Sequence, residues 1–365
     1  MTRSKHDVRL LSDYLPDKYL IQSTDKILVT GANGFIGSRV VRNLLSMGFK
    51  NVRCLVRSEA NIETLKPVEE EFGVTLEYVC GNLLSAATCR AAAEDAVVTY
   101  HLAVGGDKSF PGYVMNTVVT TRNLLDAITT DGTTIRRFVN VGSLAVYSND
   151  HLKRRALLNE SCPIASDLIG RYDPYAYAKA KQDDIVRQYA RDKGLPYVIV
   201  RPGVVFGPGK SRIPGRIGID TFGIFLHLGH GNRMPLTYVD NCAEAIALAG
   251  LVNGIDSEEF IIVDDDLPTS RQFLRGYKKL GRRFLSVPVP YPVFYVFSLL
   301  WEKYSSWSKG QLPPAFNRKT CTAYFKGNVY SNEKVKTRLH WNPGVSMTDA
   351  LTRFFASVRA ENGRA

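Results

Sequence analysis

A glycine-rich stretch near the amino terminus restricts the fold of this chain more than any other feature. It reads Thr-Gly-Ala-Asn-Gly-Phe-Ile-Gly and occupies residues 30–37. The apolar run at 26–29 before it is typical of a buried strand, and after it apolar side chains recur at helical spacing, at Val40, Val41, Leu44 and Leu45. A glycine turn between a strand and a helix is the arrangement that binds the pyrophosphate of a dinucleotide. The chain is therefore predicted to be an α/β protein.

Each glycine of this stretch has an expected role. Gly31 permits the tight turn, Gly34 lets the backbone approach a pyrophosphate, and Gly37 lets the helix pack closely on the strand. The start of the helix offers unpaired N–H groups and a positive dipole end to the phosphates. We also expect cofactor contacts from the residues between the glycines, which are Asn33, Phe35 and Ile36.

Arg57 bears on the choice of cofactor. It ends an apolar run at 51–57 that predicts the second strand, and Ser58 follows it. An enzyme that uses NAD usually carries an acidic residue there, to hold the ribose 2′-hydroxyl. A guanidinium instead suits the 2′-phosphate of NADP, so NADP is predicted to be preferred over NAD. The alternative is a solvated arginine at a strand end.

Three further apolar runs, at 76–80, 97–103 and 137–141, predict the next strands of the sheet. The first of them leads into Asn82 and Leu83, where a side-chain amide is expected to hold the adenine. His101 lies inside the second run. A histidine in an apolar strand is more often structural, so it is not assigned a catalytic role.

The candidate catalytic residues follow the strand at 137–141. Ser143 comes directly after it, at the sheet edge that faces ligands in a doubly wound fold. Tyr175 and Lys179 open a later helical segment and lie on one face of it, because they are four residues apart. A nearby ammonium favours the tyrosinate and lowers the pKa of the phenol. Such a phenol can exchange a proton with a substrate oxygen while hydride moves to or from a nicotinamide, with Ser143 holding the same oxygen.

A second pair with the same spacing, Tyr177 and Lys181, lies two residues further on. The two pairs point to different faces of the helix, so only one can face the nicotinamide.

These pieces together resemble the extended short-chain dehydrogenase/reductase group of the NAD-dependent epimerase/dehydratase superfamily. The resemblance runs from about residue 26 to 249, with a weaker match to about 355. In its motifs the chain is most similar to 3β-hydroxysteroid dehydrogenases and dihydroflavonol reductases. Beyond the glycine stretch, the matching segments are His-Leu-Ala at 101–103, the helix asparagine Asn116, Ser-x-x-Val-Tyr at 143–147, Arg-Pro-x-x-x-x-Gly-Pro at 201–208 and Tyr-Val-Asp-Asn at 238–241.

The resemblance implies the fold and several roles. It implies a Rossmann-type, doubly wound parallel sheet with a smaller, interleaved carboxyl-terminal substrate domain. It places the catalytic register at Tyr175 and Lys179, since Asp183 falls where the family has an acid after its lysine. It also adds four residues to the expected cofactor site, together with Tyr175 and Lys179 themselves: Leu102, Ala103, Pro202 and Val205.

Two departures from the family pattern matter. Asn82 stands where the family commonly has aspartate, which alters the adenine contact without abolishing it. Leu144 and Ala145 stand where sugar dehydratases of the family carry an acidic pair. Without those carboxylates the chain lacks the groups that eliminate water. A dehydratase is therefore not predicted.

The predicted function is an oxidoreductase that transfers hydride between nicotinamide and a carbonyl or secondary alcohol on a sterol-like or sugar-like small molecule. A nucleotide-sugar 4-epimerase is the alternative, although an NADP-type pocket disfavours it because epimerases retain NAD. A third hypothesis is a non-catalytic protein that binds a dinucleotide as a sensor or scaffold. Intact Ser143, Tyr175 and Lys179 argue against it.

The composition is consistent with an enzyme that acts on small molecules. The chain has 365 residues, 45% of them hydrophobic, which suffices for a large core. Its six cysteines form no Cys-x-x-Cys pair, so we expect them reduced and the protein cytoplasmic. No metal site is expected. The net charge of +12 is scattered and no nucleic-acid module is visible, so we expect an anionic substrate or lipid as partner rather than nucleic acid.

The segment at 284–301 is uncharged and apolar, and its length approaches that of a membrane span. Prolines crowd its first half, leaving a helix too short to span a membrane. We predict a buried helix lining the substrate domain. The alternative is a peripheral patch on a membrane, with Arg282, Arg283, Lys303 and Lys309 meeting lipid headgroups.

The domain organisation follows the resemblance. We predict an amino-terminal extension at 1–25 and a nucleotide-binding domain at 26–206, with returns near 237–263. The substrate-binding domain is predicted at 207–236 and 264–355. The glycine-rich, basic segment at 207–231 is either a mobile loop over the substrate or an ordinary connection. The family expectation for assembly is a homodimer through the helices around 112–129 and 175–193.

Overall fold

A seven-stranded parallel sheet forms the centre of the computed structural model, which describes residues 19–105, 109–130, 132, 134–221, 223–280, 284–309 and 311–362. In spatial order the strands are β12 (Glu259–Ile262), β7 (Tyr197–Pro202), β5 (Arg137–Val141), β4 (Ala96–His101), β1 (Lys26–Thr30), β2 (Val52–Val56) and β3 (Glu77–Cys80). The chain builds outwards from β1 in one direction and then returns to build outwards from β4 in the other. This confirms the predicted Rossmann-type, doubly wound fold, in which ligands bind beyond the carboxyl ends of the strands at the point where the order reverses.

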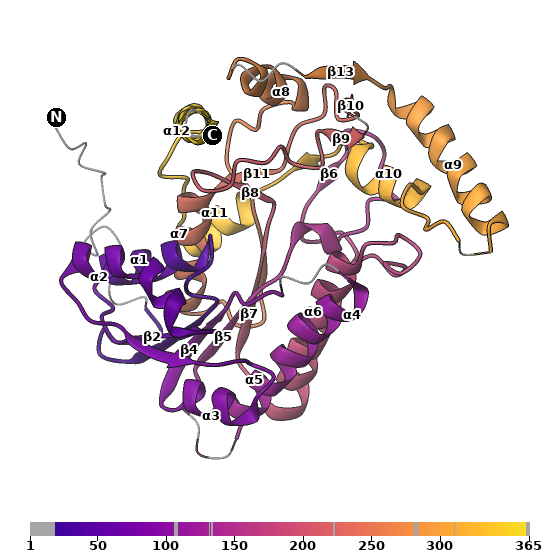
Figure 1. Cartoon of the computed structure of the whole chain (residues 1–365). Coiled ribbons are helices and arrows are strands. Elements are labelled where there is room, and N and C mark those ends of the chain that lie inside the picture. Colours follow the sequence, from indigo (N-terminus) through magenta and orange to yellow (C-terminus); the bar gives the residue numbers. More distant parts are fainter. Residues whose placement is uncertain are drawn as a thin grey trace, which may run out of the picture.

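The strands are apolar on both faces because each face is covered by helices. In β1, Ile27 and Val29 belong to one hydrophobic core and Leu28 to the other. Helices α1 (Gly37–Ser46) and α7 (Val239–Leu251) cover the first face. The second face is covered by α3 (Ala86–Ala93), α5 (Thr120–Ile128) and α6 (Pro174–Lys193), as Figure 1 shows.

The remaining elements of the sheet half are short. They are η3 (Glu59–Thr64), α2 (Lys66–Phe72), α4 (Phe110–Tyr113) and a π-helical turn η4 (Val114–Val119) that runs directly into α5. A single 3₁₀ turn, η5 (Leu144–Val146), follows β5. Residues 1–18 of the predicted extension lie outside the described residues, whereas Tyr19 forms a bridge with Val252 at the end of α7.

A second group of elements lies beyond the carboxyl ends of the central strands, in the upper part of Figure 1. One three-stranded sheet contains β9 (Gly218–Thr221), β10 (Ile224–His227) and β13 (Leu285–Pro288). Two small sheets pair β8 (Val204–Phe206) with β11 (Leu236–Tyr238), and β6 (Leu157–Leu158) with β14 (Val329–Tyr330). The helices here are α8 (Ser270–Lys278), α9 (Tyr291–Trp307), α10 (Arg318–Phe325), α11 (Glu333–Leu339) and α12 (Met347–Asn362).

The prediction of a buried helix within 284–301 is wrong for most of α9. Of its described side chains only Phe294, Ser298 and Ser305 are buried. The apolar composition of the segment predicted burial, but only one face of the helix packs on the protein, against α10 and the segment 312–316 before it. Arg282 and Arg283 lie outside the described residues. No helix in the described part of the chain has both the length and the hydropathy needed to cross a bilayer.

Candidate active site

A cavity of about 800 Å³ opens at the carboxyl ends of β1, β4, β5 and β7. Its walls come from seven segments of the chain. They are the glycine loop after β1, the segments that follow β4, β5 and β7, the start of α6, and the loop at 210–219 together with α10. The cavity therefore lies at the ligand-binding edge that the strand order predicts.

The glycine loop forms one wall of the cavity, and its geometry requires glycine at two positions. Gly31 has a φ of +67°, which side-chain-bearing residues rarely adopt. A Cβ on Gly37 would lie 2.0 Å from the carbonyl oxygen of Gly31. This confirms the predicted turn at Gly31 and the close packing at Gly37.

Helix α1 starts at this loop and no side chain caps its first turn. Uncapped N–H groups at a helix start suit an anionic group such as a phosphate. Arg39, on the same helix, donates hydrogen bonds to the carbonyl oxygens of Phe35 (2.8 Å) and Pro208 (3.2 Å) and pairs with Asp240 (3.0 Å). It thereby ties the glycine loop to the segment after β8. The backbone of this loop fits the diphosphate of a dinucleotide.

Ser143, Tyr175 and Lys179 all line the cavity. Ser143 follows the end of β5, and its hydroxyl accepts a hydrogen bond from the N–H of Ala145 (3.2 Å). Tyr175 and Lys179 lie in the first two turns of α6, whose start is capped by Asp173. The structure thus brings together three side chains that are up to 36 residues apart in sequence.

The pKa of Tyr175 does not follow the sequence prediction. Burial raises it to about 12, and hydrogen bonding with Ser143 opposes this rise only in part. Lys179 is not among the groups that shift it. Its ammonium donates to the carbonyl oxygen of Val141 (2.7 Å) and to the side chain of Gln182 (3.0 Å). Burial also lowers the pKa of Lys179, to about 8.

The alternative pair does not reach the cavity. Neither Tyr177 nor Lys181 is among the residues that line it. The ring of Tyr177 packs on Phe110, and Lys181 is exposed beside Asp184 (3.4 Å). The geometry favours the register at Tyr175 and Lys179.

A buried chain of hydrogen bonds leads from Lys179 back to β1. Gln182 accepts from Lys179 and donates to the hydroxyl of Thr121 (2.8 Å). His101 bonds to Thr121 through Nε2 (2.9 Å) and to Thr30 through Nδ1 (2.8 Å). Because Thr121 already donates to the carbonyl oxygen of Thr117 (2.5 Å), Nε2 of His101 is the donor and Thr30 donates to Nδ1.

His101 is therefore a neutral structural residue in this arrangement. Burial lowers its pKa to about 3, in keeping with an uncharged ring. The chain of bonds connects the candidate catalytic lysine to the strand that carries the glycine loop.

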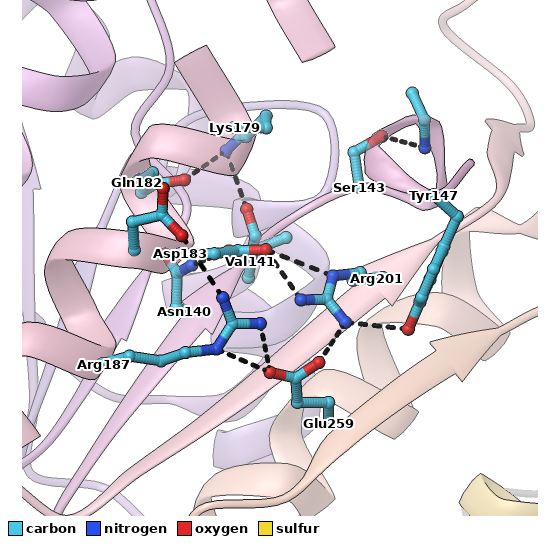
Figure 2. A network of polar contacts seen from close by, with 12 residues as sticks. Asn140, Val141, Ser143, Tyr147, Lys179, Gln182, Asp183, Arg187, Arg201 and Glu259 are labelled. Atoms are coloured by element: carbon cyan, nitrogen blue, oxygen red, sulfur yellow. Dashed lines mark hydrogen bonds and ion pairs between the residues drawn. The ribbon is translucent and has the colours of Figure 1, made fainter. Parts of the chain in front are cut away.

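A second network of polar contacts links α6 to the strands of the central sheet (Figure 2). Asp183 accepts from Asn140 of β5 (2.7 Å) and from Arg201 of β7 (2.9 Å), and the side chains of Asp183 and Arg201 are both fully buried. Arg201 also bonds to the hydroxyl of Tyr147 (2.8 Å) and to Glu259 of β12 (2.5 Å). Arg201 thus connects α6 to β7, to β12 and to the residue after η5. This positions α6, and with it Tyr175 and Lys179, relative to the sheet.

Some of the predicted cofactor residues line the cavity and others do not. The lining includes Gly31, Gly34, Phe35, Ile36, Gly37, Leu102, Tyr175, Lys179, Pro202 and Val205. It does not include Asn33, Arg57, Asn82, Leu83 or Ala103. Arg57 is exposed directly after β2, Asn82 accepts from the N–H of Leu84 (3.0 Å), and the side chain of Leu83 is buried in the core.

The lining also includes residues outside the predicted catalytic and cofactor set, three of them in the basic segment 207–231 that was predicted to be either a mobile loop over the substrate or an ordinary connection. Lys210, Arg212 and Arg216 come from the loop after β8, and Thr320, Tyr324 and Phe325 come from α10. The basic character of the loop was visible, but no local motif marks α10. Tyr324 donates to Asp173, the cap of α6 (2.7 Å), so a residue 149 positions after Tyr175 closes the site from the opposite side.

The metal-binding side chains of the described residues do not gather into a site. No group of three or more His, Cys, Asp or Glu residues among them has a geometry that could hold a metal ion. All six cysteines are free, and all but Cys80 are buried.

Comparison with known proteins agrees with this geometry. Residues 27–262 match the model of the NAD-dependent epimerase/dehydratase family. The chain is 33% identical to cinnamoyl-CoA reductase 1 of Oryza sativa subsp. japonica over 187 residues, a match that covers 50% of this chain and 54% of that protein. It is 27% identical to 2-alkyl-3-oxoalkanoate reductase of Stenotrophomonas maltophilia over 348 residues, covering 92% of this chain and all of that protein.

The fold is also found among solved structures. UDP-glucuronic acid 4-epimerase from Bacillus cereus, in complex with UDP-glucuronic acid and NAD, superposes with a TM-score of 0.67. The identity is 20%, and the superposition covers 92% of this chain and 99% of that one. The matching family model spans more than half of the sequence and includes the glycine loop, Ser143, Tyr175 and Lys179. This chain belongs to the NAD-dependent epimerase/dehydratase family and is an NAD(P)-dependent enzyme.

Proposed function

We propose that this enzyme is an oxidoreductase that transfers hydride between nicotinamide and a carbonyl or secondary alcohol on a substrate with a largely apolar body. One observation carries the proposal, namely the character of the wall of the cavity that Tyr175 lines. Leu144, Ala145, Ile213 and Phe325 line it, and no acidic residue of the described chain does. An apolar wall with a few polar groups is typical of a site for an apolar ligand with one reacting oxygen.

The roles of the catalytic residues follow from their pKa values and contacts. With a pKa of about 12, Tyr175 keeps its proton at neutral pH and can give it to a carbonyl oxygen. Ser143 would hold the same oxygen by a hydrogen bond. Lys179, anchored on Val141 and Gln182, places positive charge behind the developing alkoxide. The bound nicotinamide supplies or accepts the hydride.

We also propose that NADP is preferred over NAD. Arg57 follows β2, next to β1 in the sheet, and is exposed. This is where the adenine ribose of a dinucleotide lies in a doubly wound fold, and a guanidinium suits its 2′-phosphate. Asn33, Asn82, Leu83 and Ala103 are proposed contacts of the same half of the cofactor.

A nucleotide-sugar 4-epimerase is the second candidate. The similarity in fold to UDP-glucuronic acid 4-epimerase supports it, and so do Arg212 and Arg216 in the cavity wall, since two arginines suit a diphosphate. The absence of carboxylates at positions 144 and 145 does not distinguish the two candidates. Neither a reductase nor a 4-epimerase eliminates water, so neither needs them.

Two features of organisation are part of the same proposal. Residues 26–206 with the returns near 237–263 would bind the cofactor, and 207–236 with 264–355 would bind the substrate. A homodimer would form through α5 and α6, which lie side by side on one face of the sheet. Light scattering of the purified protein tests the dimer, which a monomeric mass would contradict.

The experiment that tests the function begins with the cofactor. The purified protein is denatured and the released nucleotide identified, and protein stripped of nucleotide is titrated with NADPH and NADH. Turnover is then measured on a panel of apolar ketones and β-keto acids and, in parallel, on UDP-sugars. We expect reversible binding with NADPH preferred and reduction of an apolar ketone. Tightly retained NAD with interconversion of UDP-sugars would overturn the reductase in favour of the epimerase.

A further inference from the structure

Helix α9 carries a stripe of exposed apolar side chains along its outer face. The stripe consists of Val293, Val296, Phe297, Leu300, Tyr304 and Trp307. Apart from the neighbours Val296 and Phe297, these residues recur every three or four positions, so they lie on one face over about four turns. Leu300 is 59% exposed and Trp307 is 77% exposed. Monomeric proteins rarely leave a contiguous apolar surface of this kind uncovered, and such surfaces mark interaction sites.

The opposite face of α9 is fixed to the protein, so the stripe cannot turn inwards. Phe294 packs against Cys321 and Phe325 of α10. The indole of Trp301 donates to the carbonyl oxygen of Pro313 (3.1 Å), and Ser305 donates to that of Leu312 (2.6 Å). In Figure 1 the helix forms an outer edge of the molecule, away from the central sheet.

Positive charge accompanies the stripe. Lys303 lies on it, three residues after Leu300 and four before Trp307, and Lys309 follows the end of the helix. Neither lysine forms an ion pair with a described residue. The single acidic residue of α9, Glu302, is paired with Arg318 of α10 (2.6 Å). The chain as a whole carries a net charge of +12.

We propose that α9 docks in the plane of an anionic lipid bilayer. The stripe would enter the boundary between headgroups and acyl chains, with Lys303 and Lys309 against lipid phosphates. Tyr304 and Trp307 have amphipathic rings that favour this boundary. A helix of 17 residues with one face packed on α10 lies on the membrane rather than across it.

The charge distribution favours lipid over a second copy of the chain. Two copies that met through this stripe would bring Lys303 and Lys309 of each into one interface, and like charges there oppose association. An anionic membrane instead meets those lysines with opposite charge. The docking does not depend on the proposed function, although Phe325, which α9 covers, also lines the cavity.

The test measures binding of the full-length protein to floated vesicles. Vesicles with about 30 mol% phosphatidylserine are compared with vesicles of pure phosphatidylcholine. One double variant, Leu300→Gln with Trp307→Gln, shortens the stripe. A second, Lys303→Gln with Lys309→Gln, removes its charge.

Two matched controls change the same chemistry elsewhere. Leu157→Gln with Val329→Gln replaces exposed apolar residues on the paired strands β6 and β14. Arg191→Gln with Lys193→Gln removes two exposed charges at the end of α6. All substituted side chains are exposed, and unchanged thermal unfolding verifies that the variants fold.

We expect the wild-type protein to bind the anionic vesicles and the stripe variant to bind about tenfold or more weakly. The charge variant should bind anionic vesicles no better than neutral ones, and the controls should bind like the wild type. Quenching of tryptophan fluorescence by brominated acyl chains, present in the wild type and reduced in the stripe variant that lacks Trp307, gives a second readout. Absence of vesicle binding, or a stripe variant that binds like the wild type, overturns the proposal. A dimer that the stripe variant dissociates, without vesicle binding, would assign the surface to a second copy instead.

Discussion

At the scale of single residues, the proposed reaction depends on the protonation state of one phenol, that of Tyr175. Tyr175 has a pKa of about 12, raised by burial, so it is protonated through the neutral range. Reduction of a carbonyl needs a proton donor, whereas oxidation of an alcohol needs a tyrosinate. We therefore propose that the protonated phenol of Tyr175 suits the site to reduction of a carbonyl. In this proposal Lys179 contributes positive charge rather than a lowered phenol pKa.

The role of Tyr175 predicts a sharp loss on removal of its hydroxyl. Tyr175→Phe should lower kcat about 100-fold or more, the usual contribution of general acid catalysis, while changing cofactor affinity little. Tyr177→Phe, two residues along and outside the cavity, is the matched control and should retain activity. Steady-state kinetics with a fluorescence titration of NADPH measures both quantities. A normal rate for Tyr175→Phe, with a loss in Tyr177→Phe, would move the role to Tyr177.

Arg57 predicts a difference between the two cofactors. Arg57→Ala should weaken NADPH about 10- to 100-fold, which corresponds to the loss of a charge-assisted hydrogen bond, and should leave NADH nearly unchanged. Arg90→Ala removes another exposed arginine and serves as the control. Dissociation constants from fluorescence titration decide the matter. Equal losses for the two cofactors would show that Arg57 does not contact the 2′-phosphate.

At the scale of elements, the strand–loop–helix unit at 26–46 is the part whose sequence most directly dictates its shape. The backbone of Gly31 and the contact between Gly37 and the Gly31 carbonyl exclude side chains there. The same closeness brings the start of α1 to the edge of the sheet. Any added atom at Gly37 must move the helix away from that edge.

Gly37→Ala should therefore destabilise the protein by about 3 kcal/mol, in the range of overpacking in a rigid site, and should weaken dinucleotide binding. Gly231→Ala is the matched control, because a Cβ there meets nothing within 4 Å. Urea unfolding and NADPH titration of both variants supply the measurement. Equal stability in the two variants would mean that the loop adapts to an added methyl group.

At the scale of the whole molecule, buried histidines predict how stability depends on pH. Burial lowers the pKa of His101 to about 3 and that of His227 to about 4. In the unfolded chain the histidine pKa is about 6.5. Between about pH 6.5 and the lowered pKa values, the unfolded chain therefore binds more protons than the folded protein. Stability is then fully present above about pH 6.5 and is lost as the pH falls towards 4.

His101→Gln keeps a donor and an acceptor but cannot titrate, so its free energy of unfolding should fall less steeply between about pH 7 and 4 than that of the wild type. The difference should approach ~1.4 kcal/mol per pH unit. His151→Gln, at an exposed histidine, should keep the wild-type slope. Urea unfolding at several pH values, followed by circular dichroism, gives the slopes. Identical slopes for His101→Gln and the wild type would contradict a neutral buried His101.

Much of the sheet and of the active site could be predicted, because the signals are local in sequence. The predicted strand at 137–141 matches β5, and Ser143 follows it at the expected edge. Tyr175 and Lys179 share a helix face because of their spacing alone. The pKa of Tyr175 could not be predicted in the same way, because it depends on burial and on where Lys179 directs its hydrogen bonds.

By itself, the sequence determined the glycine loop, the parallel sheet and the order of Ser143, Tyr175 and Lys179, since spacing along the chain decides what lies at a strand end or on a helix face. Only the tertiary structure decided that Tyr324 and Phe325 close the cavity, that His101 connects to Lys179 through Gln182, and that α9 exposes its apolar face. These outcomes depend on contacts between segments far apart in the chain. The local sequence of a helix does not specify which distant segment packs on each of its faces.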